Sequence, residues 1–207
     1  MKYKIYRCVF VILSILFIII IVCIGKKYYV RNINENENSE IIKKFFSENN
    51  KENYIKLEED SKNQNTKIQI HGYDVIGKIK IEKINIEYPI VGIETSNPEE
   101  TKKPMKFAIV RYWGENVNDY GNLSIAGHNN HDGTLFGKTK NLDINDELEL
   151  TDLHMQTIKY KIYSKFVTNP NDVSVLKTTD NGIREVTLIT CTNGNKERLI
   201  LKAKEVK

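Results

Sequence analysis

The 207-residue sequence is poor in cysteine, with only three of these residues. Two of them, Cys8 and Cys23, fall within an apolar segment of membrane length near the amino terminus. This leaves Cys191 without a disulfide partner, so the rest of the chain is not held by a disulfide framework. A single unpaired thiol indicates either a nucleophile or a small buried hydrophobic side chain.

The sequence also lacks a basic stripe with interleaved aromatic residues. It has 31 Lys and Arg against 27 Asp and Glu, a formal net charge of +4. Residues 1–31 contain six of the basic residues and no acidic ones, which leaves 25 basic against 27 acidic residues in the remainder. Since a polyanion-binding protein needs a concentrated positive surface, nucleic acid is not an expected partner.

Charged side chains are missing from residues 8–24, where only Ser14 is polar. Such a run is long enough to cross the hydrocarbon core of a lipid bilayer as a helix. Aromatic residues suited to the membrane interface flank it, namely Tyr3, Tyr6, Tyr28 and Tyr29. No small-residue cleavage site follows, and Gly25-Lys26-Lys27 ends the run with charge, so residues 1–31 are predicted to be an uncleaved anchor rather than a signal peptide. Basic residues are equally numerous on both sides, so charge does not choose an orientation.

Residues 32–72 have the composition of a polar spacer, rich in Asn, Glu and Lys. Ser39 is a possible N-cap for a helix with an apolar stripe at Ile41, Ile42, Phe45 and Phe46. The alternative is a disordered tether, which the composition of residues 49–53 and 61–65 also allows.

From residue 73 to residue 207 the sequence changes to short alternating or β-branched runs separated by turn residues. Eight strands are predicted, at 75–81, 84–90, 107–111, 122–128, 147–150, 157–166, 184–191 and 198–204. Eight short strands are typical of a mainly β domain, either a barrel or a sandwich. Residues 129–146 and 167–183 form two longer connections, and in the second Asp172 is expected to cap a helical turn.

Cys191 and Arg198 are predicted to lie on two strands of one hairpin. If Gly194-Asn195 form the turn, Cys191 lies opposite Arg198; if Asn193-Gly194 form it, Arg198 is the diagonal neighbour. In both registers sulfur and guanidinium share a face, because the apolar residues of these strands occupy the alternate positions. Arg198 can then stabilise negative charge that develops near the sulfur.

A thiol that attacks an amide also needs a base, and histidine is the usual one. His128 is the best placed of the four histidines, because it follows the strand-like run 122–126 and Gly127, where a side chain emerges at the rim of a sheet. A metal cluster of His128, His131 and Asp132 is disfavoured, because the spacing fits no usual zinc pattern and one distant cysteine supplies no second ligand pair.

These residues resemble the sortases, membrane-anchored cysteine transpeptidases of Gram-positive surfaces. Thr187-Leu188-Ile189-Thr190-Cys191 looks like the T-L-x-T-C motif of that family, Arg198 matches its arginine on the following strand, and Ile125-Ala126-Gly127-His128 matches its histidine motif. The likeness extends over about residues 73–203. It implies an eight-stranded sortase-type β-barrel in which Cys191 is the acyl-thioester nucleophile, His128 the general acid/base and Arg198 the stabiliser of substrate and oxyanion.

The resemblance further implies the substrates and the location. The clients would be secreted proteins with a C-terminal sorting signal, and the acceptor an amine of peptidoglycan or pilin type. The amino terminus would lie inside the cell and the catalytic domain on the extracytoplasmic face. Val173, Val175 and Leu176 would wall the peptide groove together with Thr190, although core packing explains the three apolar residues equally well. No metal or other cofactor is expected.

The loop residues Gly127-His128-Asn129 with Asp132-Gly133-Thr134 and Phe136 resemble those of class B sortases. Two features differ from that pattern. The 167–183 connection is shorter than the helical insertion typical of class B, and Asn193 stands where some members carry an acidic residue just after the cysteine. Two other functions fit the same residues. Thiol, imidazole and guanidinium also serve a cysteine endopeptidase that only hydrolyses its substrate. A non-catalytic membrane-tethered β module would use Cys191 for packing alone.

Overall fold

The computed structural model describes residues 2–46, 68–93, 98–178 and 182–206. The chain divides into two compact units, one ending at Glu37 and the other beginning at Asn38. About half of the predicted spacer, residues 47–67, lies outside the described residues, and this part includes residues 49–53 and 61–65.

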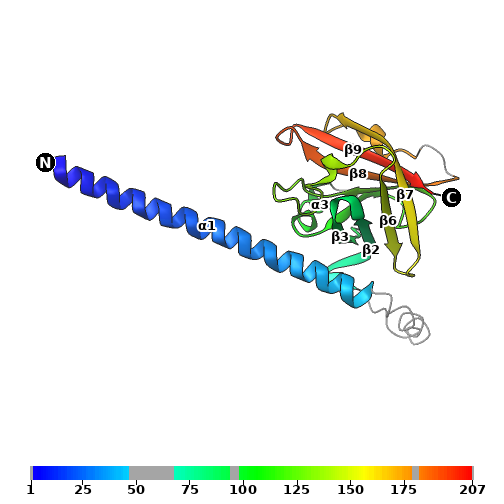
Figure 1. The fold of residues 1–207 in the computed structure, drawn as a ribbon, viewed down its shortest axis with the longest axis horizontal. Coiled ribbons are helices and arrows are strands. Elements are labelled where there is room, and N and C mark those ends of the chain that lie inside the picture. Colours follow the sequence, from blue (N-terminus) through cyan, green and yellow to red (C-terminus); the bar gives the residue numbers. More distant parts are fainter. Residues whose placement is uncertain (1, 47–67, 94–97, 179–181, 207) are drawn as a thin grey trace. The chain divides into compact units, whose positions relative to one another are not determined.

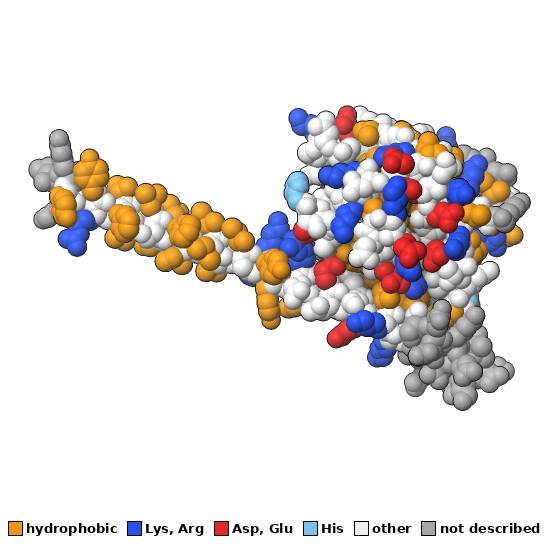
Figure 2. Space-filling view, viewed as in Figure 1, with side chains coloured by type: hydrophobic (Ala, Val, Ile, Leu, Met, Phe, Trp, Pro, Cys, Tyr) orange, Lys and Arg blue, Asp and Glu red, His pale blue; other side chains and the backbone are white. Residues whose placement is uncertain are grey.

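The amino-terminal unit is helical, as part of the helix α1 that runs from Lys2 to Phe45. The apolar stretch of α1 is long enough to cross a membrane and is a candidate membrane span. Hydrophobic side chains cover much of this stretch in Figure 2. Ser14 is accommodated because its hydroxyl donates to the Phe10 carbonyl oxygen at 2.9 Å, which satisfies a polar group within the helix.

The prediction that a separate helix begins at Ser39 was wrong. Ser39 lies inside α1, because the largely polar residues 32–38 continue the helix and neither Pro nor Gly interrupts them. The predicted apolar stripe is present, with Ile41 and Phe46 buried. Both lie in the carboxy-terminal unit, and they belong to a hydrophobic cluster with other residues of the same unit, such as Ile70 and Val110.

The carboxy-terminal unit is a closed β-barrel (Figure 1). Its strands are β1 (Gln69–Ile70), β2 (Tyr73–Ile81), β3 (Ile86–Val91), β4 (Ile109–Gly114), β5 (Gly121–Ala126), β6 (Glu147–Asp152), β7 (Thr157–Thr168), β8 (Arg184–Thr192) and β9 (Glu197–Glu205). They lie in the order β1-β2-β3-β4-β5-β8-β9-β7-β6, and a β2–β6 pairing closes the barrel. Eight strands were predicted and confirmed, while the short β1 was not predicted.

The connections include short helical turns. These are α3 (Pro98–Thr101) and the 3-10 turns η2 (Glu82–Ile84), η3 (Pro104–Lys106), η4 (Thr139–Asn141) and η5 (Val173–Leu176). The strand predicted from Ile84 begins instead at Ile86, because Ile84 closes η2. Asn85 follows in the left-handed conformation with φ 51°, and its N–H bonds to the Glu82 carbonyl. Asparagine tolerates this conformation better than most residues.

Alternation along the strands separates the barrel interior from its outer face. Residues of one parity on β8 and β9 belong to the main core cluster, among them Val186, Leu188, Leu199, Leu201 and Ala203. Residues of the other parity therefore lie on the outer face. Strands β5 and β8 are parallel neighbours, so their carboxyl ends reach the same rim of the barrel. That rim is where the two strongest sequence motifs end.

Candidate active site

Cys191 lies next to the end of β8, directly opposite Arg198 on the antiparallel strand β9. The structure therefore selects the first of the two registers. The turn explains this choice, because Gly194 and Asn195 have φ values of 61° and 70°, as a type I′ hairpin requires. The Lys196 N–H closes the turn on the Asn193 carbonyl at 3.2 Å. Cys191 itself is half-buried and free of any disulfide.

His128 reaches the same rim from β5. The parallel register pairs Ala126 with Ile189, and the Gly127 N–H continues the ladder by donating to the Ile189 carbonyl at 3.2 Å. Carrying the register two residues further brings His128 level with Cys191. Because side chains alternate along strands, residues 128, 191 and 198 all belong to the outer face. The predicted thiol and guanidinium thus come from the adjacent strands β8 and β9, and the imidazole comes from the segment that follows β5, the other neighbour of β8.

The segment before His128 is packed tightly enough to require glycine. A Cβ added at Gly127 would lie 2.6 Å from Ile109 Cδ1 and 2.9 Å from Phe136 Cδ2. The Phe136 N–H in turn donates to the His128 carbonyl oxygen at 3.0 Å. The Gly-His dipeptide of the motif therefore lets the backbone approach the core immediately before the histidine.

The surroundings of His128 favour a neutral imidazole. Burial lowers the pKa of His128 below its ordinary value of 6.5, because a half-buried site disfavours the charged form. The positive charge of Lys106, in η3, lowers this pKa further. At neutral pH the imidazole is therefore uncharged and able to accept a proton.

Arg198 is half-buried, and its guanidinium is held by the hairpin that carries it. Nη1 donates to the backbone carbonyl oxygens of Asn195 and Glu197, each at 3.1 Å. On its other side Arg198 pairs in register with Thr168 of β7. A guanidinium has several N–H donors, so two bonds through one nitrogen are compatible with further bonds to a substrate oxygen.

The four residues predicted to bind substrate lie in different environments. Val173 is the most exposed, with 68% of its surface accessible, whereas Val175 is buried at 6%. Leu176 is half-buried, and its carbonyl accepts from Asn122 Nδ2 at 3.0 Å. Thr190 is buried, and its hydroxyl donates to the Gly127 carbonyl at 2.8 Å. The hydroxyl of Thr190 thus joins the cysteine motif to the histidine motif.

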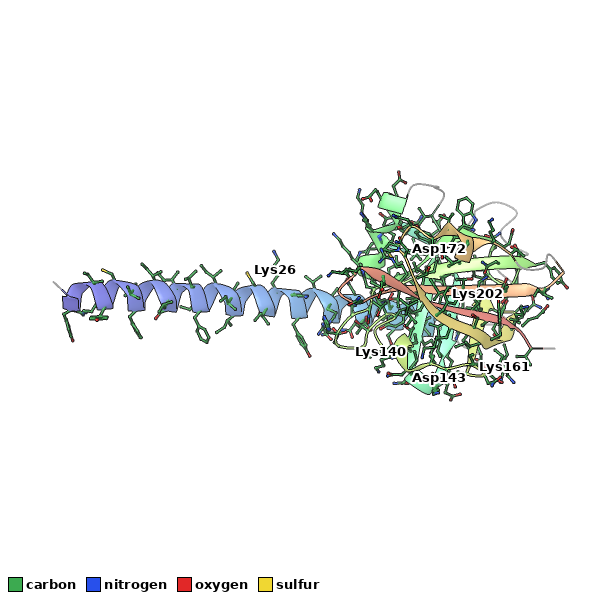
Figure 3. The ribbon with its side chains drawn as sticks, turned by 90° about the horizontal axis from the view of Figure 1, so that it is seen from above. Lys26, Lys140, Asp143, Lys161, Asp172 and Lys202 are labelled. Atoms are coloured by element: carbon green, nitrogen blue, oxygen red, sulfur yellow. The ribbon has the colours of Figure 1, made fainter. Side chains whose placement is uncertain are left out.

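The connection from β7 to β8 is fixed near its start. Asp172 caps η5 as predicted, since its carboxylate accepts from the Ser174 N–H at 3.0 Å. It also accepts from the Thr168 hydroxyl at 2.6 Å. Further along, Lys202 Nζ lies 3.4 Å from the Lys177 carbonyl and 3.6 Å from the buried Glu185 carboxylate. Figure 3 labels Asp172, on this connection, and Lys202, on β9.

Asn129 is a residue to which the sequence interpretation gave no separate role. Its Nδ2 donates to the Cys191 carbonyl oxygen at 2.8 Å, a direct link between the residue after the histidine and the cysteine. Its place next to His128 was the only signal in the sequence, and nothing there indicates a contact with Cys191.

His131 and Asp132, the other two residues of the disfavoured metal cluster, lie in the loop after His128. The Asp132 carboxylate accepts from the N–H and hydroxyl of Thr134, and His131 is exposed. Within the described residues, no group of three His, Cys, Asp or Glu side chains is arranged to hold a metal ion. This rim combines a half-buried thiol at the end of β8, a neutral imidazole on the segment that follows the neighbouring β5 and a guanidinium on the opposite strand β9, and these three groups are the components of thiol-based acyl transfer.

The sequence profile of the sortase domain matches residues 79–206. No curated protein matches the sequence. Among solved structures, a Clostridium perfringens Sortase D5 transpeptidase is similar, with a TM-score of 0.60 and 28% sequence identity over 85% of this chain and 99% of that one.

Two more distant structures share the fold. Sortase C from Clostridium perfringens SM101 is similar with a TM-score of 0.56 and 21% identity, over 83% of this chain and 99% of that one. Sortase A from Corynebacterium diphtheriae is similar with a TM-score of 0.56 and 20% identity, over 87% of this chain and 95% of that one. The predicted sortase-type barrel is therefore confirmed, while the class B lean stays a prediction.

Proposed function

Because the chain belongs to the sortase family and is a transpeptidase of that type, we propose that Cys191 is its nucleophile, His128 its general acid/base and Arg198 its oxyanion stabiliser. The observation that carries this proposal is the register of three adjacent strands. Cys191 pairs with Arg198 across the hairpin, and the parallel register of β5 with β8, continued two residues past Ala126, brings His128 level with Cys191.

The first half of the reaction forms an acyl-enzyme. Neutral His128 accepts the thiol proton, and the Cys191 sulfur attacks the carbonyl carbon of the scissile peptide bond. The carbonyl electrons move to oxygen, where the Arg198 guanidinium stabilises the negative charge. As the tetrahedral intermediate collapses, the C–N bond breaks and the His128 imidazolium gives its proton to the departing amine. A thioester on Cys191 remains, and His128 is neutral again.

The second half returns the enzyme to its starting state. An acceptor amine attacks the thioester carbon, and neutral His128 takes the proton that the amine loses. The C–S bond breaks, and the thiolate that leaves recovers this proton from His128. The products are a new amide bond and the free thiol. Water in place of the amine would give a carboxylic acid, the outcome expected of a cysteine endopeptidase.

The substrate side of the proposal follows the family. The clients are secreted proteins with a C-terminal sorting signal, and the acceptor is an amine of peptidoglycan or pilin type, so the enzyme attaches proteins to the cell envelope. Val173 is the best supported contact for the sorting peptide, because it is exposed on the connection that begins at Thr168, opposite Arg198. Val175, Leu176 and Thr190 would shape the groove from beneath, since they are buried or half-buried.

The proposed arrangement of the chain has three parts. Residues 1–31 anchor the protein in the bilayer through a single span at residues 8–24, residues 32–72 are the spacer, and residues 73–207 are the catalytic barrel. The catalytic barrel then lies on the extracytoplasmic face of the cell membrane. The long apolar stretch of α1 supports the anchor.

Product analysis tests the function. The full-length protein in detergent would be incubated with a library of sorting peptides and with glycine or a diamine as acceptor. The proposal expects a peptide joined to the acceptor, formed by the wild type and absent with Cys191→Ala. Free acid as the only product would favour an endopeptidase, and no cleavage by a folded wild type would favour a binding module.

A further inference from the structure

We propose that Asn129 is a positioning residue that holds the His128 imidazole beside the Cys191 thiol. This inference rests on the proposed function, because it assumes that these two side chains act together. The Asn129 side chain bonds to the backbone of Cys191, so it would act through the backbone around the reacting atoms.

The carbonyl of Cys191 would ordinarily be satisfied by the parallel ladder. The last backbone bond between β5 and β8 runs from the Gly127 N–H to the Ile189 carbonyl at 3.2 Å. In a parallel pair the next bond would join residues two further along each strand, from the backbone N–H of Asn129 to the Cys191 carbonyl. The side-chain amide of Asn129 makes this bond instead, with Nδ2 at 2.8 Å from the oxygen.

Because the side-chain amide of Asn129 takes the place of the backbone N–H, the backbone can leave the sheet without losing its hydrogen bond to β8. Asn129 forms an isolated antiparallel bridge with Leu135, so its backbone has turned toward the loop 129–135. A side chain long enough to reach back replaces the backbone donor. The segment after β5 therefore stays bonded to β8 beyond the last backbone bond of the ladder.

The result is that His128 is held from both sides. Before it, the Gly127 carbonyl accepts from the Thr190 hydroxyl at 2.8 Å. After it, Asn129 bonds to the Cys191 carbonyl. The residues flanking the histidine are thus bonded to Cys191 and to the residue that precedes it. Removal of the Asn129 amide leaves one of these two links.

The fold depends little on this bond, but the geometry of the site depends on it more. Asn129 is exposed, and a single hydrogen bond of this kind contributes only about 0.5–1.5 kcal/mol to stability. A displacement of about 1 Å in a catalytic group, by contrast, can reduce a rate by roughly 100-fold. Asn129→Ala should therefore fold normally and still place His128 poorly.

The test measures the reactivity of Cys191 without any peptide substrate. The full-length protein in detergent would be treated with iodoacetamide over a range of pH, and alkylation of the peptide that contains Cys191 would be followed by mass spectrometry. Asn129→Ala should slow alkylation near neutral pH by roughly tenfold and move the pH midpoint toward that of His128→Asn. Asn129→Gln, which keeps an amide, should restore part of the rate.

Asn130→Ala is the matched control. Its amide bonds to the Thr134 hydroxyl at 2.9 Å, within the same loop, and that bond does not involve β8. The inference predicts the wild-type pH profile for this variant. If Asn129→Ala and Asn130→Ala slow the reaction equally, Asn129 serves only the stability of the loop and the inference is overturned.

Two further outcomes separate this inference from the proposed function. If His128→Asn changes the profile and Asn129→Ala does not, the inference alone is wrong. If His128→Asn leaves the profile unchanged, imidazole and thiol do not act together, and both proposals are wrong.

Discussion

The hydroxyl of Thr190 donates to the carbonyl oxygen of Gly127 at 2.8 Å, so the residue before the cysteine is bonded to the residue before the histidine. Thr190 is buried, with 3% of its surface accessible. This hydrogen bond therefore connects the threonine of the cysteine motif, on β8, to the glycine of the histidine motif, which follows β5. Their presence together in the sequence has a physical reason.

Thr190→Val tests the hydrogen bond between Thr190 and Gly127. Valine has nearly the same shape, but it leaves the Gly127 carbonyl without its donor, which should lower the free energy of unfolding by about 1–3 kcal/mol. Urea denaturation of the full-length protein in detergent measures the change. Thr190→Ser keeps the hydroxyl and should lose less stability; equal losses in the two variants would contradict the role given to this bond.

Lys106→Gln should shift the pH dependence of the reaction. Burial lowers the pKa of His128 most, and the charge of Lys106 lowers it further, so removal of that charge raises this pKa toward its ordinary value. His128 must be neutral to accept the thiol proton, so the acidic limb of kcat/KM should move to higher pH. Lys103→Gln, at a neighbouring exposed lysine, is the control and should leave the limb where it is. If the acidic limb of kcat/KM is the same in Lys106→Gln as in the wild type, Lys106 does not lower the pKa of His128.

The same shift in pKa makes stability depend on pH. Since the pKa of His128 is lowered in the folded protein, the unfolded chain binds the proton more readily below the ordinary value of 6.5. The contribution of this group to stability is complete above that value and is lost as the pH falls through the folded pKa. As the pH falls from about 8 to about 5, the wild type should therefore lose this stability, and His128→Asn should become more stable relative to it. A constant difference in the free energy of unfolding would contradict the lowered pKa.

Gly127→Ala should disturb the site by overpacking. The new methyl group would lie 2.6 Å from Ile109 Cδ1 and 2.9 Å from Phe136 Cδ2, and such insertions cost about 1–3 kcal/mol. The backbone before His128 must shift to relieve these contacts, so the rate of transpeptidation should fall together with the stability. Adding Ile109→Val removes one of the two contacts and should restore part of both quantities. No recovery in the double variant would show that crowding against Ile109 is not the cause.

The eight strands were predictable because apolar alternation along residues such as Val186, Leu188, Leu199 and Leu201 is a local pattern. The hairpin register was limited to two choices by Gly194 and its neighbours. The parallel pairing of β5 with β8 could not be predicted from such local patterns, because the two strands are separated in the sequence by β6 and β7. The strand pattern singles out His128 as the best placed histidine, at the rim of a sheet, but only the family resemblance pairs it with Cys191.

Two features could not be predicted from local patterns. Helix α1 continues through residues 32–38, where every residue except Ile33 is polar, and neither Pro nor Gly interrupts the helix there. The bond of Asn129 to the Cys191 carbonyl depends on where the backbone leaves the sheet, which is a property of the folded loop. An asparagine in a loop is otherwise typical of a turn, so its type alone does not indicate the contact.

The most direct test of the account is the site of acylation. The full-length protein would be incubated with the sorting-peptide library in the absence of an amine, quenched in acid, digested and analysed by mass spectrometry. The account predicts an acyl group, removable by hydroxylamine, on the peptide that contains Cys191, and none with Cys191→Ala. An acyl group on another residue, or peptide cleavage that persists in Cys191→Ala, would contradict it.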